Sequence, residues 1–321
     1  YQGGEGSSMH AMEAWEYAMI AETAIRRIRI INSSAKVAMQ AGPLSLNISA
    51  YQTQGDQLYS QYQSRAGNYG TDDPDYLVHH AYSTGEDGHD THEDILQYLQ
   101  NKWSGIPVLA TEWNVIEPED TADYGATSDQ YRLGMEKAWR LTALFDTMVS
   151  NNVQGANFWP VVQHSGITMF KYEASGTRYI AADTFALLRN LWLGLWQGNN
   201  TSPMRRATVT YSGAGTAVEV FGYCQQNKRR ARVFICARGA VAQNVKVTIK
   251  GMGATIHSRS MDRLSGVSGP QTFNINSLPT ATVADNLSVN YQTVSGGHEF
   301  TVPIRQTNSA YELIMLDVRY Y

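Results

Sequence analysis

The carboxylate of Glu112 stands at the end of a short apolar run, residues 106–111, and Trp113 and Asn114 follow it at once. Such a run, bounded by polar residues, predicts a buried strand of a parallel sheet. A carboxylate is costly to bury inside a strand, whereas the C-terminal end of a barrel strand is a natural catalytic position. A salt-bridged structural glutamate is the alternative interpretation of this residue.

A second carboxylate, Glu5, follows the expected end of an earlier strand and precedes a helix. Cleavage of a glycosidic bond needs two such groups: an acid that protonates the leaving oxygen, and a carboxylate that attacks or activates water. In a barrel both groups come from strand ends that converge on one mouth. Glu5 and Glu112 can therefore act together although they lie far apart in sequence.

The elements that must position these groups alternate between strand and helix. Four strands are expected at 36–41, 75–82, 106–113 and 153–159. Helices are expected at 9–31, after residue 90 through 103, at 128–151 and, capped by Asp183, through 196, with a weak helix around Tyr51–Tyr62. Crossovers far longer than a hairpin indicate parallel strands. We interpret residues 1–198 as the C-terminal half of a (β/α)8 barrel.

From residue 199 onward the helical periodicity disappears. Short β-branched and aromatic runs, separated by turn residues, predict an antiparallel β-sandwich over 199–321. The expected strands are 207–211, 216–223, 231–237, 243–250, 271–276, 298–304 and 310–319. The fold class is therefore α/β plus all-β: the second half of a TIM barrel followed by β-sandwich material.

One hairpin is specific enough to predict its register. If the turn centres on Asn227-Lys228, Cys224 lies opposite Ala231 and Cys236 lies opposite Glu219. The two thiols then lie far apart on opposite faces, which argues against a disulfide. A slip of one residue in the register would weaken this argument.

Composition excludes several classes of partner. The chain of 321 residues is 43% hydrophobic and 17% charged, with a net charge of −4, which indicates a globular protein and gives no sign of a nucleic-acid or membrane partner. No stretch is apolar enough to span a bilayer. The 19 Tyr and 7 Trp suit a protein that stacks flat hydroxylated ligands, although such residues also build cores.

Four short motifs together resemble the clan A glycoside hydrolases. They are Gly4-Glu5, His80-Ala-Tyr82, Thr111-Glu-Trp-Asn114 and Phe158-Trp159. The resemblance implies that Glu5 is the acid/base and Glu112 the nucleophile. It also implies that Tyr82 hydrogen-bonds the nucleophile, that Trp159 is the platform on which a sugar stacks, and that His80, Trp113 and Asn114 contact substrate.

One position departs from the clan pattern. Asn usually precedes the acid/base and contacts the substrate 2-hydroxyl, whereas Gly4 stands here. Either that contact comes from another residue or the match at Glu5 is shifted. The layout of barrel half and sandwich looks most similar to the family-86 β-agarases and β-porphyranases, but family 30, 39 and 51 enzymes share the motifs.

The expected function is that of a retaining, endo-acting glycoside hydrolase on a polysaccharide or oligosaccharide, first of all a red-algal galactan such as agarose or porphyran. The alternatives are a clan A xylanase, arabinofuranosidase or glucosidase, and a non-catalytic carbohydrate-binding protein on a decayed barrel. The resemblance further implies a secreted, periplasmic or cell-surface protein.

The first residues, Tyr1–Glu5, have the character of the inside of a fold. Four strands alone would leave parallel edges exposed, and such edges are a liability. We therefore expect the N-terminal half of the barrel to be supplied by upstream sequence or by a separate chain.

We expect no metal or other cofactor. His79, His80, His89 and His92 fit no standard zinc spacing, and no Cys accompanies them. The acidic loop 85–90 lacks the alternating oxygen ligands of a calcium loop. His80 is better explained as a contact at the barrel mouth.

Overall fold

The computed structural model describes most of the chain. The described residues are 12–42, 47–83, 88–115, 134–159, 169, 178–193, 204–213, 218–238, 243–267, 281–305 and 310–321. Glu5, one of the two expected catalytic carboxylates, lies outside them, as do the expected strand 271–276 and the start of the helix expected at 128–151.

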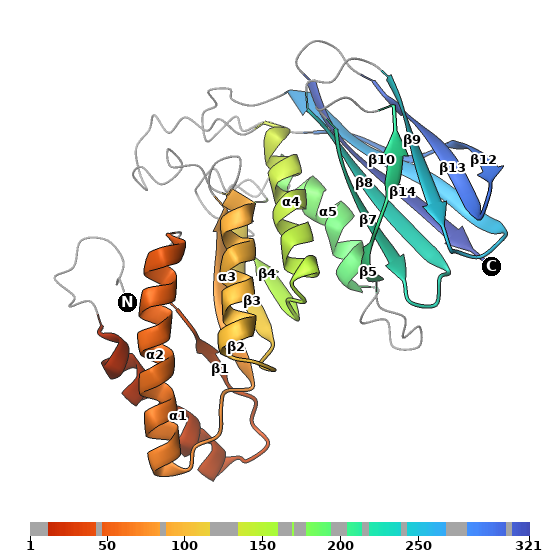
Figure 1. The fold of residues 1–321 in the computed structure, drawn as a ribbon. Coiled ribbons are helices and arrows are strands. Elements are labelled where there is room, and N and C mark those ends of the chain that lie inside the picture. Colours follow the sequence, from red (N-terminus) through yellow and green to blue (C-terminus); the bar gives the residue numbers. More distant parts are fainter. Residues whose placement is uncertain are drawn as a thin grey trace, which may run out of the picture. The chain divides into compact units, whose positions relative to one another are not determined.

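The first part of the chain alternates helices and strands (Figure 1). In chain order its elements are α1 Ala14–Ile31, β1 Ala38–Gln40, α2 Ile48–Tyr69, β2 Tyr76–Ser83, α3 Gly88–Lys102, β3 Val108–Val115, α4 Glu136–Ser150, β4 Gly155–Phe158 and α5 Ile180–Leu193. The four strands form one sheet in the order β1-β2-β3-β4. β1 pairs with β2, and β3 with β4, in parallel.

The expected strands are confirmed, with changes at their ends. The weak helix around Tyr51 is a full helix of 22 residues, because the Asn47 side chain accepts the Ala50 N–H at its start and Gly70 closes it in the left-handed region. The expectation that Asp183 caps the last helix is wrong: α5 begins at Ile180, so Asp183 lies within its first turn.

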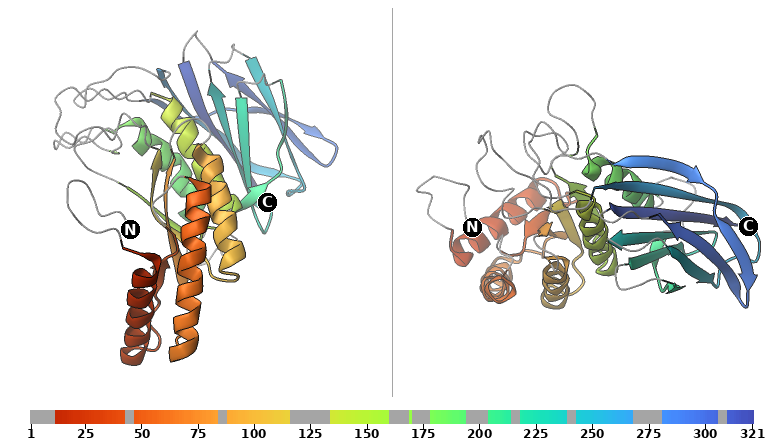
Figure 2. Two further views of the ribbon diagram at one scale, coloured as in Figure 1. Left: turned by 60° about the vertical axis from the view of Figure 1, so that its left-hand side comes forward. Right: turned by 90° about the horizontal axis from the view of Figure 1, so that it is seen from above.

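Helices cover one face of the sheet. Figure 2 shows α2 and α3 side by side along it, and α3 contacts β2. Along β2 every second residue is buried, including Leu77, His79 and Ala81. α3 buries Ile95 and Leu96 on its inner face. The period of two on the strand thus fixes which side chains of β2 meet helix and which face the other way.

The described residues from 204 onward form antiparallel β structure. Its strands are β5 Met204–Ala207, β6 Thr210–Ser212, β7 Val218–Gln225, β8 Arg230–Arg238, β9 Gln243–Lys250, β10 Ile256–Val267, β11 Thr282–Leu287, β12 Asn290–Val294, β13 Gly297–Ile304 and β14 Ala310–Tyr320. They form a six-stranded sheet, β11-β10-β14-β8-β7-β5, and a four-stranded sheet, β12-β13-β9-β6. The described part of this region contains no helix.

A single apolar core joins the inner faces of the two antiparallel sheets, including Ile235, Val247 and Phe300. The hairpin register is confirmed, because Cys224 pairs with Ala231 and Cys236 with Glu219. Neither cysteine forms a disulfide. The sequence analysis missed β10, β11 and β12 and merged β5 with β6.

The chain forms two compact units. One comprises residues up to Asn114 with Thr147–Trp159, and the other comprises Val115–Asp146 with residues from Pro160 on. Most of α4 therefore belongs with the β region. Within that second unit the indole of Trp139 on α4 donates a hydrogen bond to Glu219 on β7.

Two glycines give a matched test of packing in the first unit. A Cβ at Gly42 would lie 2.4 Å from Cζ of the buried Tyr51, whereas a Cβ at Gly67 in α2 would meet no atom within 4 Å. Gly42→Ala should lower the free energy of unfolding by about 1–3 kcal/mol, as overpacking does. Gly67→Ala should raise it by about 0.4–1 kcal/mol, because it restricts the unfolded chain. Urea denaturation of both variants checks the signs, and equal effects would contradict the packing around Tyr51.

Candidate active site

Three neighbouring strands bring polar and aromatic side chains to one edge of the parallel sheet. His80 and Tyr82 come from the end of β2, Glu112 from β3, and Trp159 directly follows β4. Because the carboxyl ends of parallel strands meet at the same edge, these residues converge although almost 80 positions separate His80 from Trp159. The structure thus brings together four of the residues expected at the site.

The Glu112 carboxylate is the centre of this group. Tyr82 Oη donates a hydrogen bond of 2.7 Å to Glu112 Oε2, as expected. His80 Nδ1 lies 3.5 Å from the same oxygen. Among the described residues no hydrogen bond reaches Oε1 of Glu112, whose side chain is 37% exposed. One carboxylate oxygen is therefore held, and the other is open to solvent or a ligand.

Trp159 offers a partly exposed aromatic side chain beside Tyr82, the residue that holds this carboxylate. It is 37% exposed, and its ring meets that of Tyr82 edge to face at 6.1 Å. Its backbone is fixed at both ends: its N–H donates to the Trp113 carbonyl, and its carbonyl accepts the Asn114 side-chain amide at 2.8 Å. The end of β3 thus positions the residue that follows β4.

Trp113 and Asn114 do not lie where the sequence analysis placed them. Trp113 is 1% exposed and packs edge to face on Phe158, and Asn114 is fully buried. Side chains so deeply buried cannot contact a polysaccharide. The expectation that they bind substrate is corrected: Asn114 supports Trp159, and Trp113 belongs to the interior. The register between β3 and β4 shifts between Ala110 and Trp113, and the consecutive residues from Trp113 to Val115 are all buried.

Sequence reasoning missed a buried histidine pair behind the site. His79 Nε2 lies 3.0 Å from His92 Nδ1, and both side chains are buried. Burial lowers the pKa of His92 to about 4, and burial together with the neighbouring His92 and His80 lowers that of His79 well below its usual range. Both rings are therefore neutral near pH 7. The alternation of β2 was the signal that His79 faces a helix.

The described ranges hold no group of three His, Cys, Asp or Glu side chains arranged for a metal ion. In the same ranges the helices are all too short or too polar to cross a bilayer.

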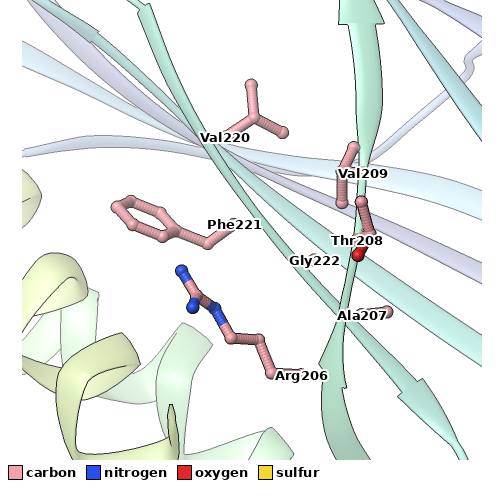
Figure 3. Close-up of a pocket in the computed structure, with 7 residues that line it drawn as sticks. All are labelled: Arg206, Ala207, Thr208, Val209, Val220, Phe221 and Gly222. Carbon is pink, nitrogen blue, oxygen red and sulfur yellow. The ribbon is translucent and has the colours of Figure 1, made fainter.

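A separate hollow of about 360 Å³ lies in the β region, where β5 leaves β7 (Figure 3). It is lined by Arg206, Ala207, Thr208, Val209, Val220, Phe221 and Gly222. Arg206 and Phe221 point to the same side of the strands. Its lining contains neither a carboxylate nor an imidazole, so it lacks an acid–base pair, and the edge of β2–β4 is the better candidate for chemistry.

No protein-family model matches this chain, and no curated protein matches it. A solved structure of AbfB, a family 51 α-L-arabinofuranosidase from Bifidobacterium longum, is similar, with a TM-score of 0.59 and 11% identity over 96% of this chain and 64% of that chain. The likeness is one of fold. A GH30 endoxylanase from Clostridium papyrosolvens C71 aligns with a TM-score of 0.47 and 14% identity, over 94% of this chain and 60% of that chain.

This chain therefore spans less than two thirds of the length of either structure. Its parallel sheet followed by antiparallel sheets has the arrangement found in the arabinofuranosidase structure. Family 51 is also among the families whose motifs the sequence resembles. The likeness of fold and the resemblance of the motifs agree on the class of fold.

The histidine pair predicts how stability depends on pH. The folded pKa of His92 lies near 4 and the unfolded value near 6.5, so the unfolded chain binds the extra proton between these values. The stabilisation is complete above pH 6.5, and about 3 kcal/mol of it is lost as the pH falls to 4.

Urea denaturation across this pH range should show that the free energy of unfolding falls more steeply with decreasing pH in the native protein than in His92→Gln. Asp75 does not blur the result: hydrogen bonds from Lys36 and the Val37 N–H hold its pKa far below its usual range, so its stabilisation is lost only at lower pH. Identical slopes in both proteins would show that the pair is not neutral and buried.

Proposed function

We propose that this protein is a retaining glycoside hydrolase in which Glu112 is the nucleophile and Glu5 the acid/base. The observation that supports it best is the hydrogen bond from Tyr82 to Glu112 Oε2, beside an accessible tryptophan. A partly exposed carboxylate at a strand end, with one oxygen held by a phenol and the other open, suits attack on an anomeric carbon.

In the proposed mechanism each of these residues has a task. Oε1 of Glu112 forms a bond to the anomeric carbon as the glycosidic bond breaks, and the leaving oxygen takes the proton of Glu5. Tyr82 Oη keeps donating to Oε2 and so orients the carboxylate. In the second step Glu5 removes a proton from water, which attacks the same carbon and frees Glu112. Trp159 presents its ring for a sugar face.

The first proposed substrate is a β-linked red-algal galactan, agarose or porphyran, on the strength of the sequence layout. The second is an arabinose-containing polysaccharide, which the structural likeness to the family 51 arabinofuranosidase favours. Incubation with agarose, porphyran, arabinan and arabinoxylan, with the products separated by chromatography, distinguishes the two. Binding to one of them without cleavage would support the non-catalytic alternative.

Substitution of the two carboxylates should have different outcomes. Glu112→Ala should reduce turnover of an activated aryl glycoside by about 10⁴-fold or more, because the nucleophile is lost. Glu5→Ala should slow the first step least for substrates that carry good leaving groups. Added azide should then restore turnover by the Glu5→Ala variant, and the product should be a glycosyl azide of retained configuration. Product stereochemistry is read by NMR.

A matched control is Glu93→Ala on α3, whose carboxylate contacts only a neighbouring glutamine among the described residues and should leave turnover unchanged. Full activity of Glu112→Ala would rule out the proposed nucleophile. Azide rescue of Glu112→Ala with inverted product remains compatible with it, whereas azide rescue with retained product at Glu112 would reverse the two roles.

We also propose that further βα units bind at the β1 side of the sheet. Within the described residues β1 is an edge strand. The neighbouring α1 exposes large apolar side chains, namely Trp15, Met19, Ile20, Ile28, Ile30 and Ile31, and Met12 just before the helix is exposed as well. A parallel edge beside such a surface needs cover, and additional strands and helices would supply both the pairing and the apolar contact.

Analytical ultracentrifugation of the 321-residue chain tests this proposal. The chain alone should self-associate, and exchanging Trp15 and Ile20 for Gln should reduce the association without loss of helix signal, because both lie on the exposed side of α1. A monodisperse monomer with full glycosidase activity would overturn the proposed cover.

A further inference from the structure

Two faces of β2 carry different polar contacts. His80 and Tyr82 turn to Glu112, whereas His79, between them and the start of the strand, meets His92 of α3. Because the side chains of β2 alternate between its two faces, a rotation of the strand that breaks the contact of His79 with His92 also displaces His80 and Tyr82 from Glu112. The histidine pair thus sits directly behind the proposed active-site residues.

His92 is linked to Tyr82 as well as to His79. The backbone carbonyl of Tyr82 interacts with the His92 imidazole, although among the described residues His92 Nε2 has no hydrogen bond of good geometry. The start of α3 also packs tightly on the end of β2, where a Cβ at Gly88 would lie 2.4 Å from Ser83 Oγ. His79 and the end of β2 at Ser83 both lie against the first turns of α3.

The pair is held in one arrangement by its surroundings. The ring of Tyr51 on α2 meets His79 edge to face at 6.1 Å, and also meets Tyr98 of α3 at 6.1 Å. Two neutral imidazoles can share only one N–H, so one nitrogen donates and the other accepts. An apolar pair could fill the same space, but it would not specify the rotation of the strand as a directional contact does.

We infer that His92, through His79 and the Tyr82 backbone, is a positioning residue that sets the rotation of β2 so that the Tyr82 hydroxyl reaches Glu112. The role assigned to Tyr82 rests on the proposed glycosidase function. The geometric part, that His92 controls the contact between Tyr82 and Glu112, does not. A hydrogen bond of 2.7 Å weakens steeply with small displacements of its donor.

Kinetics of the full chain test the inference. His92→Leu should lower kcat on an aryl glycoside about tenfold or more, as a small misplacement of an active-site group does, while KM changes little. His92→Gln, which can still donate and accept, should keep more of the activity. Leu99→Ala, a buried residue of α3 farther along the helix, should lower the melting temperature without lowering kcat where the variant is folded.

A double substitution separates positioning from general damage. Because His92 acts through Tyr82, His92→Leu should have no further effect on kcat in the Tyr82→Phe background. Equal effects in both backgrounds, or an equal loss of kcat in Leu99→Ala, would overturn the inference.

NMR gives a readout that does not need activity. The ¹³Cζ resonance of Tyr82, assigned from Tyr82→Phe, should shift when Glu112→Gln removes the charged acceptor, and should shift the same way in His92→Leu. An unchanged resonance in folded His92→Leu overturns the positioning role. If the resonance shifts as expected while no glycoside is cleaved by the native protein, the proposed function fails and the positioning role stands.

Discussion

The hydrogen bond between Tyr82 and Glu112 depends on β2 being a strand with a strict period of two. Its odd-numbered members from Leu77 to Ser83 are buried, and the alternate residues His80 and Tyr82 are left to face the carboxylate. Burial of apolar residues such as Leu77 and Ala81 on one face stabilises the strand, whereas the polar residues on the other face contribute little to its stability. The same register places a neutral imidazole pair on the buried side, so chemistry on one face and packing on the other come from a single backbone geometry.

A comparable use of two faces occurs on β7 within the second compact unit. Val218 belongs to the core between the antiparallel sheets. Tyr223 lies on the opposite face, and its hydroxyl donates a hydrogen bond of 2.7 Å to the carboxylate of Asp146 on α4. Asp146 is also paired with Arg206, so its buried charge is compensated. Burial and the Asp146 carboxylate raise the pKa of Tyr223 well above its usual range, and its phenol stays a donor. α4 is thus anchored on the sandwich sheet by polar contacts.

The sequence predicted elements and strand ends better than the fate of individual side chains. Alternation and turn residues were enough for β2, β3 and the hairpin in which Glu219 opposes Cys236. The substrate contacts expected of Trp113 and Asn114 rested on the resemblance to a family, and the motif does not show that both side chains are buried where the pairing of β3 with β4 shifts register.

The missed strands show a different limit. β12, Asn290–Val294, is short, polar and largely exposed, so nothing in its sequence separates it from a loop. Its pairing with β13 creates the strand. The histidine pair was equally hidden, since His79 and His92 meet only through tertiary packing.

The placement of the two thiols has a consequence for how the protein can be made and handled. Cys236 is 1% exposed, and Cys224 lies on the other face of the hairpin with its pKa raised by burial, so little thiolate forms there. Thiol–disulfide exchange then has neither a geometrically suitable partner within the hairpin nor a reactive nucleophile. The β-sandwich should fold to the same state under reducing and oxidising conditions, with no need for an oxidant or an isomerase.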